Sequence, residues 1–295
     1  MITLYKFFKF FYNKLGLKNI KFLNNIKYYL IFYVLNYKKT VNEYKLKQIN
    51  FKLSDKKSIE KYFNKYSNQE CVIVGNGPSL NKLDLSKINN IKTFGVNSIF
   101  LMTKKNGFKP SFYVVEDRLV VKHNTEQIID YDVEHKFFPS LYKEKLAGSK
   151  GNYFNLDSRF YRDEYNIMNS TNIKFSDDFS KVAYAGQSVT YLNMQLAYYM
   201  GFKTVYLIGI DFNYILPKDV VKDGRVWISK GDDPNHFDKS YFGKGKESND
   251  PQLHKTIFAY KKAEEVFSNQ NKKIINLTPE TKLDVFEKKD FNSIF

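Results

Sequence analysis

Small polar residues and glycines that could bind a ligand follow several short apolar stretches of this sequence. They are Gly75, Asn76, Gly77, Asn97, Glu116, Asp117, Asp211 and Asn276. An asparagine amide can both donate to and accept from a base or a ribose, and glycine lets another group approach the backbone closely. If the apolar stretches form neighbouring strands, the residues that follow them contribute to one site.

One histidine, His236, lies in a polar, turn-rich stretch, residues 232–243, beyond the apolar stretch that ends at Asp211. Imidazole changes its protonation near neutral pH and can take a proton from a hydroxyl group. A single loop histidine is more often an ordinary surface residue, so the residue by itself leaves both interpretations open.

Two pairs of adjacent acids, Glu116-Asp117 and Asp232-Asp233, could each hold a divalent cation bound to a diphosphate. Adjacent acids are more often solvated loop charges. The sequence also has no Cys/His cluster with the spacing of a zinc site. We therefore assign no metal ligands from the sequence.

The turn at residues 75–79 is similar to a phosphate-binding turn but lacks the third glycine and the lysine of the dinucleotide and Walker motifs. The alternative is a plain strand-to-helix turn that needs positive φ. Ser188 and Thr190 open a predicted helix, where a phosphate or carboxylate would be favoured. Ordinary N-capping explains Ser188 equally well.

The elements that position these residues alternate between strands and helices. Residues 71–74, 93–97, 112–117, 204–211 and 273–276 are predicted strands, and residues 188–200 and 253–269 are predicted helices, the first closed by Gly201. This alternation predicts a single Rossmann-like α/β domain with a mostly parallel sheet. In such sheets ligands bind outside the carboxyl ends of the strands.

Basic charge is concentrated at the start of the chain. The net charge is +16, and residues 1–39 contain eight lysines and no acid. Their longest run of apolar and aromatic residues, which begins after Lys27 and ends at Leu35, is roughly half the length of a membrane-spanning helix. Lysines beside aromatic residues favour a helix on an anionic membrane surface, and packing on the rest of the chain is the alternative.

These patterns predict a basic, aromatic helical segment at 1–50, a connecting helix at 51–69 and the Rossmann-like domain at 70–295. The single cysteine, Cys71, excludes an intramolecular disulfide and fits a reducing compartment. Four arginines are too few for a typical nucleic-acid interface, so we expect no nucleic-acid partner.

Two segments carry a resemblance to known families. Residues 72–80 and 201–212 resemble strands of the bacterial lipooligosaccharide sialyltransferases and of the MptE-like family. That family is named for a 6-hydroxymethylpterin diphosphokinase and has relatives in flagellin glycosylation, the nonulosonate transferases. Residues 235–243 and 275–283 are more similar to the MptE-like group.

The sialyltransferase resemblance implies a variant of the GT-A fold and an inverting transfer from a CMP-activated sugar with no obligatory metal. It implies donor or nucleotide binding by Asn76, Asn97, Asp117 (or Glu116) and Ser188. To these the candidate donor-binding set adds Gly75, Gly77, Ser79, Asp211 and Tyr214. The family's tyrosine after the later strand corresponds to Asn213, with Tyr214 next. Its catalytic histidine corresponds to Lys244, so we assign the base to His236 and expect Tyr214, Tyr241 or Lys244 to stabilise the leaving phosphate.

We therefore expect an inverting glycosyltransferase that uses a CMP-linked, sialic-acid-like donor and a cell-surface glycan or glycolipid acceptor. It would work in the bacterial cytoplasm at the inner face of the cell membrane, held there by residues 1–50; self-association into a homo-oligomer is left open. The alternative is a diphosphokinase acting on a small heterocycle with ATP and Mg²⁺, with Asp117 and Asp211 at the metal.

Overall fold

The computed structural model describes residues 54–161, 173–215, 220–223 and 226–295. The predicted segment 1–50 therefore lies outside the described residues, and its helical and membrane-binding character stays a prediction. Within the described part, no helix is long and apolar enough to cross a membrane.

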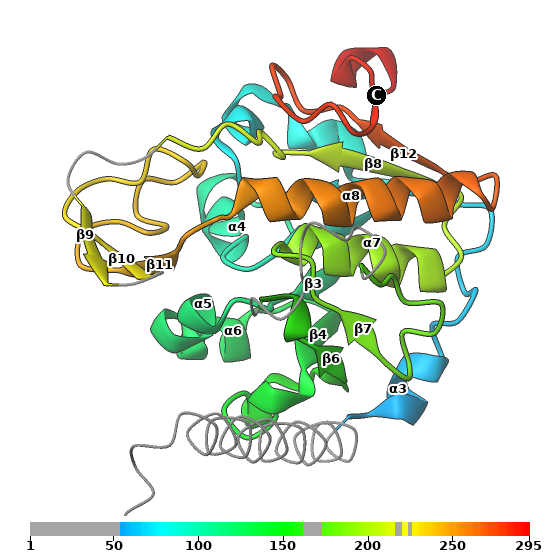
Figure 1. The fold of residues 1–295 in the computed structure, drawn as a ribbon, viewed down its shortest axis with the longest axis horizontal. Coiled ribbons are helices and arrows are strands. Elements are labelled where there is room, and N and C mark those ends of the chain that lie inside the picture. Colours follow the sequence, from blue (N-terminus) through cyan, green and yellow to red (C-terminus); the bar gives the residue numbers. More distant parts are fainter. Residues whose placement is uncertain (1–53, 162–172, 216–219, 224–225) are drawn as a thin grey trace, which may run out of the picture. The chain divides into compact units, whose positions relative to one another are not determined.

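The described residues form a parallel sheet with the strand order β13-β12-β8-β1-β2-β3-β4-β5 (Figure 1). The strands are β1 (Glu70–Val74), β2 (Lys92–Val96), β3 (Phe112–Val114), β4 (His135–Pro139), β5 (Asn152–Phe154), β8 (Thr204–Ile208), β12 (Lys273–Asn276) and β13 (Glu287–Lys288). The chain runs outward from β1 to β5 and then returns to β8 on the other side of β1. The order reverses between β1 and β8, which is where α/β sheets bind ligands.

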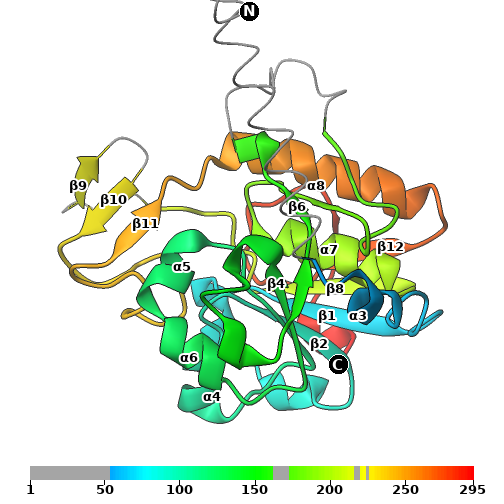
Figure 2. The same ribbon diagram turned by 90° about the horizontal axis from the view of Figure 1, so that it is seen from below.

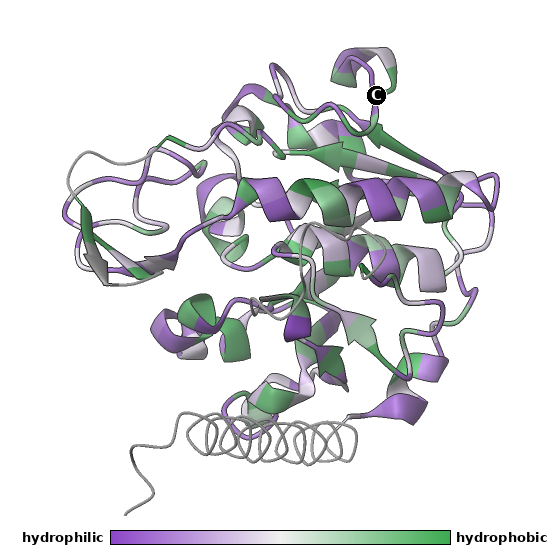
Figure 3. Cartoon of the chain, in the orientation of Figure 1, coloured by the Kyte–Doolittle hydropathy of each residue, from purple (hydrophilic) through white to green (hydrophobic). Residues whose placement is uncertain are grey.

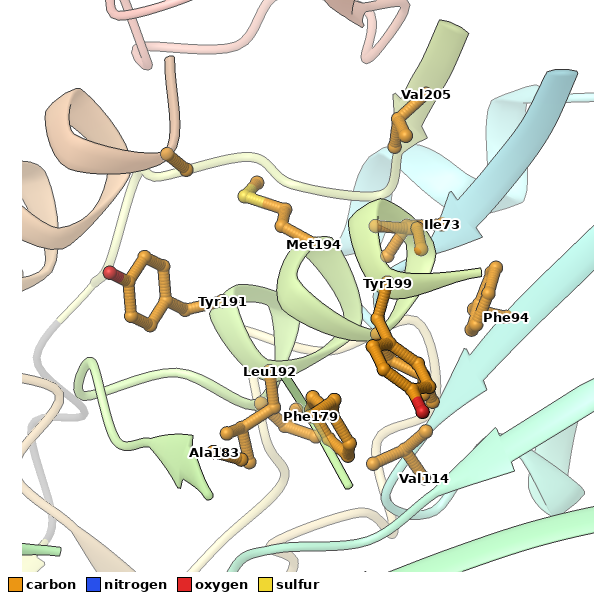
Figure 4. Packing of buried hydrophobic residues seen from close by; sticks show 14 of the residues in the cluster. Ile73, Phe94, Val114, Phe179, Ala183, Tyr191, Leu192, Met194, Tyr199 and Val205 are labelled. Carbon is orange, nitrogen blue, oxygen red and sulfur yellow. The ribbon is translucent and has the colours of Figure 1, made fainter. Parts of the chain in front are cut away.

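Both faces of the sheet are buried, which explains why its strands have continuous apolar sequences. In β1, Cys71 and Ile73 belong to one core, while Val72 and Val74 belong to the other. The first core contains α7 (Val189–Tyr199) and α8 (Leu253–Ser268), which contact each other. Figure 4 shows residues of α7 packed among Ile73, Phe94 and Val114 of the sheet.

The opposite core is covered by short helices. They are the 3₁₀ helices η2 (Pro78–Lys82) and η3 (Leu85–Ile88) and the α-helices α4 (Phe100–Asn106), α5 (Arg118–His123) and α6 (Thr125–Asp130). Helix α8 is amphipathic: Ala259, Ala263 and Phe267 are buried, while hydrophilic residues alternate with them along the helix (Figure 3). The predicted Rossmann-like α/β fold is thus confirmed.

One sequence prediction about the fold is wrong in extent. Of the predicted helix at 51–69, the structure describes residues 54–69, and among these the α-helix is confined to α3 (Lys56–Glu60). Asn64 and Asn68 adopt left-handed backbone conformations, with φ of 50° and 63°, which a continuous helix cannot contain. Tyr62 and Tyr66 are buried in the same core as α7, so this segment packs as part of the domain and does not act as a linker.

Smaller elements surround the sheet. A three-stranded antiparallel sheet, β9 (Val220–Asp223), β10 (Val226–Ser229) and β11 (Glu247–Asn249), lies apart from the parallel sheet in both views and contacts α5 (Figures 1 and 2). Strands β6 (Leu156–Asp157) and β7 (Ala183–Tyr184) pair in parallel. Further 3₁₀ helices are η4 (Ser140–Tyr142), η5 (Ala147–Ser149), η6 (Arg159–Tyr161) and η8 (Phe291–Ser293).

Candidate active site

A cavity of about 620 Å³ opens at the carboxyl ends of β1, β2, β3 and β8. The residues predicted from the strand ends that line it are Gly75, Asn76, Gly77, Asn97, Glu116, Asp117 and Asp211. Asn276 is the exception: it is buried, and its side chain accepts a hydrogen bond from the Thr278 amide. The switch point of the sheet therefore brings together nearly all the strand-end residues.

The two glycines after β1 are required by contacts within the protein. A Cβ atom at Gly75 would lie 2.4 Å from the carbonyl oxygen of Gly209, and one at Gly77 would lie 1.8 Å from Oδ2 of Asp211. Gly77 has an extended backbone with φ of −67°, and Gly75 is not among the residues with positive φ. The alternative of a turn that needs positive φ is therefore wrong; the turn needs glycine because it packs against the end of β8.

Ser79 and Asp211 form a bridge beneath this turn. The Ser79 amide donates to Oδ1 of Asp211 at 3.1 Å, and its hydroxyl donates to Oδ2 at 2.7 Å. Burial raises the pKa of the Asp211 carboxyl, and the bonds from Ser79 oppose that rise. Asp211 lines the cavity whereas Ser79 does not, so Ser79 acts on the site through Asp211.

Asn76 connects three parts of the site. Its Nδ2 donates to the carbonyl oxygen of Val96 and to the hydroxyl of Tyr241, each at 3.0 Å. Only 8% of Asn76 is exposed, and its Oδ1 has no hydrogen-bond partner among the described residues. A buried acceptor without a donor is costly, and a ligand that donates a hydrogen bond would remove that cost.

His236 belongs to a loop that is attached directly to the turn after β1. The amide of Phe237 donates to the carbonyl oxygen of Asn76 at 2.8 Å, and the Asn81 side chain donates to the Phe237 carbonyl at 2.9 Å. His236 lines the cavity, and its Nδ1 lies 2.7 Å from Oδ2 of Asp233. The imidazole stacks on the ring of Tyr241, with centroids 3.9 Å apart and planes 5° apart.

The two pairs of adjacent acids are placed differently: Glu116 and Asp117 both line the cavity, whereas Asp232 and Asp233 are separated by their burial. The Asp232 side chain is 76% exposed and lies near Lys239, whereas that of Asp233 is 4% exposed. Asp117 caps α5 by accepting from the Leu119 amide at 2.7 Å. Among the described residues, no group of three or more His, Cys, Asp or Glu side chains is arranged to hold a metal ion.

The amino-terminal ends of both long helices reach the cavity. Ser188 caps α7: its Oγ accepts from the Thr190 amide at 3.2 Å and from the Tyr260 hydroxyl of α8 at 3.0 Å. The capping interpretation of Ser188 is thus correct, and the residue also lines the cavity. Gln187 and Gln252, which precede α7 and α8, line it in left-handed conformations with φ of 63° and 43°.

Two predicted residues differ in their placement. Tyr214 lines the cavity beside Trp227, and burial raises its pKa to about 12. Lys244 is exposed and is not among the cavity residues, so its proposed role at the leaving phosphate gains no support from its position.

Residues 45–216 match the sequence pattern of the family described as 6-hydroxymethylpterin diphosphokinase MptE-like. The match spans more than half of the 295 residues. The chain belongs to the MptE-like family. A comparison with curated proteins gave no match.

Two solved structures have folds similar to that of this MptE-like chain. One is the MAf glycosyltransferase from Magnetospirillum magneticum AMB-1, with 14% identity and a TM-score of 0.47, covering 83% of this chain and 39% of the other. The second is the sialyltransferase CstII from Campylobacter jejuni in complex with a substrate analogue, cytidine-5′-monophosphate, with 15% identity and a TM-score of 0.41, covering 77% and 86%. The chain thus spans well under half the length of the first.

Several cavity residues of the MptE-like chain were not predicted as site residues. They are Arg118, Tyr142, Gln187, Asn235, Ser248, Asn249, Asp250, Gln252 and Tyr260. Most come from loops or short elements that carry no apolar pattern. From the sequence, Asp233 is a candidate only as half of a metal-binding pair. The Asp-Pro-Asn sequence of its turn could have indicated that Asp233 is held within the loop, because its Oδ1 accepts a hydrogen bond from the Asn235 amide two residues later.

Proposed function

We propose that this MptE-like chain is an inverting glycosyltransferase that moves a sugar from a CMP-linked, sialic-acid-like donor to a hydroxyl of a glycan. The observation that carries the proposal is the position of His236. Its imidazole lines the same cavity as the buried amide of Asn76, at the edge of the sheet where nucleotides bind, and its Nδ1 is held by Asp233.

In the proposed reaction the acceptor hydroxyl oxygen attacks the anomeric carbon of the donor. His236 takes the hydroxyl proton on Nε2 while the new C–O bond forms. The bond between the anomeric carbon and the phosphate oxygen breaks, and its electron pair leaves on the phosphate of CMP. A single displacement of this kind inverts the configuration at the anomeric carbon.

Tyr241 is suited to bind the departing phosphate. Its oxygen accepts hydrogen bonds from Asn76 Nδ2 at 3.0 Å and from the Ser98 amide at 3.4 Å. Both contacts use its lone pairs, so its own O–H proton can be donated to a ligand oxygen, with the Ser98 side chain as a competing partner. Burial raises the pKa of Tyr241, so the phenol remains protonated and can donate.

The charges around the cavity support a donor with one phosphate. Among the described lining residues, Arg118 is the sole Lys or Arg, although the whole chain has 47 basic residues. Four carboxylates of the described residues line the cavity, and those of Asp117, Asp211 and Asp250 accept hydrogen bonds from backbone amides; the fourth belongs to Glu116. A diphosphate would normally need several cationic groups or a metal ion, whereas one phosphodiester can be bound by helix amino termini and one arginine.

The acceptor and the location are proposed from the charge of the N-terminal segment. The lysine-rich segment 1–50 suits an enzyme that works on a glycan or glycolipid at the inner face of a bacterial membrane. Flotation of the full chain with anionic vesicles, compared with a chain that starts at Ser54, tests this part. Equal flotation of the two chains would exclude membrane binding through residues 1–53.

A diphosphokinase is the second candidate, and the description of the family favours it. Asp117 and Asp211 both line the cavity, where they could contact a magnesium ion carried by the phosphates of ATP. In that reaction the substrate hydroxyl would attack the β-phosphorus of ATP, and AMP would leave.

Thermal shifts of the full chain separate the two candidates. CMP, CDP, UDP, GDP and ATP are compared with and without Mg²⁺; a ligand at 100 times its Kd adds about 2.7 kcal/mol to the free energy of unfolding. Release of CMP from CMP-N-acetylneuraminic acid by the wild-type chain, lost in His236→Ala and retained in His254→Ala, supports the transferase. Stabilisation only by ATP with Mg²⁺ would overturn it.

A further inference from the structure

We propose that Asp233 is a positioning residue for the proposed base: it fixes the His236 imidazole as the Nδ1–H tautomer, so that Nε2 accepts the proton of the acceptor hydroxyl. The expected effect of Asp233 on the reaction rate rests on the proposed function. The state of the imidazole can be measured whether or not the reaction has been identified correctly.

The contact between the two side chains is short and shielded from water. His236 Nδ1 lies 2.7 Å from Asp233 Oδ2, and the side chains are 20% and 4% exposed. A carboxylate accepts hydrogen bonds, so the proton of this contact belongs to Nδ1 and the lone pair of the neutral ring lies on Nε2. The same division of roles orients imidazole bases and metal ligands in other proteins.

The carboxylate is held in place from its other sides. Its Oδ1 accepts from the Asn235 amide at 2.8 Å, and its Oδ2 also accepts from the Phe242 amide at 3.0 Å. Burial alone would raise the pKa of the Asp233 carboxyl. The bond and charge of His236 and these two amides outweigh burial and lower the pKa, so the carboxyl stays ionised at neutral pH.

The plane of the imidazole is fixed by aromatic rings. Tyr241 stacks on it with centroids 3.9 Å apart, and Phe242 meets it edge-on at 5.3 Å. Tyr241 is itself held by Asn76. The ring therefore cannot turn about its bond to Cβ without breaking the bond to Asp233 and losing the stacking.

This arrangement also explains how the loop accommodates a positive charge. When His236 takes the proton, the imidazolium lies beside the Asp233 carboxylate, and the ion pair stabilises the product of the proton transfer. Among the described residues, the titratable groups that interact with the Asp233 carboxylate, besides His236, are Tyr214, Tyr241 and Lys246, and Lys246 also interacts with Asp238. Lys246 donates to the carbonyl oxygens of Ser240 and Tyr241.

The test compares Asp233→Asn with Asp232→Asn in the full chain. Asp232 is the neighbouring, exposed carboxylate, so its variant controls for the loss of one charge in the loop. The first readout is the ¹⁵N spectrum of the histidine rings, with His236 assigned by its absence in His236→Gln. We expect the Nδ1–H tautomer in the wild type and in Asp232→Asn, and its loss in Asp233→Asn.

The second readout is the rate of CMP release from CMP-N-acetylneuraminic acid as a function of pH. We expect kcat to fall roughly 10²–10⁴-fold in Asp233→Asn with little change in KM. Asp233→Glu keeps a carboxylate, so the Nδ1–H tautomer and part of kcat return.

Persistence of the Nδ1–H tautomer in Asp233→Asn overturns the proposal whatever the rate. A kcat in Asp233→Glu that stays as low as in Asp233→Asn although the Nδ1–H tautomer returns also overturns it, because the rate then does not depend on the tautomer. If the wild-type chain releases no CMP, the proposed function fails, and the spectra still decide whether Asp233 sets the tautomer.

Discussion

Gly77 offers a direct test of how the end of β8 shapes the turn after β1. In Gly77→Ala the new methyl group would lie 1.8 Å from Oδ2 of Asp211, 2.6 Å from its Cγ and 2.8 Å from the carbonyl oxygen of Gly209. Atoms in ordinary contact are about 3.5–4.0 Å apart. The carboxylate of Asp211 must therefore leave its place, because the Gly209 carbonyl belongs to the backbone and cannot rotate away alone.

The size of the effect follows from what is lost. Insertion of a methyl group into a packed site costs about 1–3 kcal/mol. Displacement of Asp211 also breaks its bonds with the Ser79 amide and hydroxyl, and hydrogen bonds to a charged group contribute about 1.5–3 kcal/mol. We expect a loss of about 3 kcal/mol in the free energy of unfolding, which lowers Tm by about 6–12 °C in a domain of this size.

The assay is thermal or urea unfolding of the full chain, with Gly231→Ala as the control. A Cβ at Gly231 would have no neighbour within 4 Å, so its variant should stay within about 0.5 kcal/mol of the wild type. In an Asp211→Ala background, Gly77→Ala should cost less than alone because the clash with the carboxylate is gone. A Gly77→Ala chain as stable as the Gly231→Ala chain would refute the reasoning.

Three further predictions concern the cavity. Tyr241→Phe keeps the ring beside His236 but leaves Asn76 Nδ2 without this acceptor; unfolding should show a loss of about 1–3 kcal/mol, and no loss would contradict the contact. Arg118→Gln should raise the KM for CMP-N-acetylneuraminic acid about tenfold, with Arg118→Lys intermediate; an unchanged KM would remove Arg118 from donor binding. The pKa of Asp233 is lowered in the folded protein, so its contribution to stability is fully present above the ordinary aspartate pKa of about 3.9. That contribution is lost as the pH falls through the pKa of Asp233 in the folded protein. Between pH 6 and 3 the Tm of the wild type should therefore fall more than that of Asp233→Asn, and parallel curves would contradict this.

The central part of the fold could be predicted because its sequence signals are local. Strand β1 is apolar on both faces since two cores enclose it, and α7 ends where Gly201, with φ of 90°, allows a left-handed turn. Parallel strands place their carboxyl ends on one edge, so the strand-end residues could be assigned to one site from their positions in the sequence.

The rest of the site could not be predicted because it depends on distant contacts. Strands β9 to β11 have no marked apolar alternation, and their sheet is held by contacts such as that of Lys122 with Glu247 at 2.5 Å. The contact of Asp233 with His236 could not be predicted because it forms only when the loop that carries both residues is folded. The sequence indicates that the glycines after β1 allow another group to approach the backbone closely. It does not indicate that the group close to Gly77 is the Asp211 side chain and not a ligand.

The hydrogen bond between Asn76 and Tyr241 joins residues that are 165 positions apart. The two halves of the cavity meet only after the chain has completed the outward run of strands, returned to β8 and closed the loop that bears His236. Contacts so distant in sequence form slowly because closing long loops costs chain entropy. Ligand binding should therefore appear in the last phase of refolding, and a nascent chain that ends before residue 233 would contain β1 and β8 yet have no base.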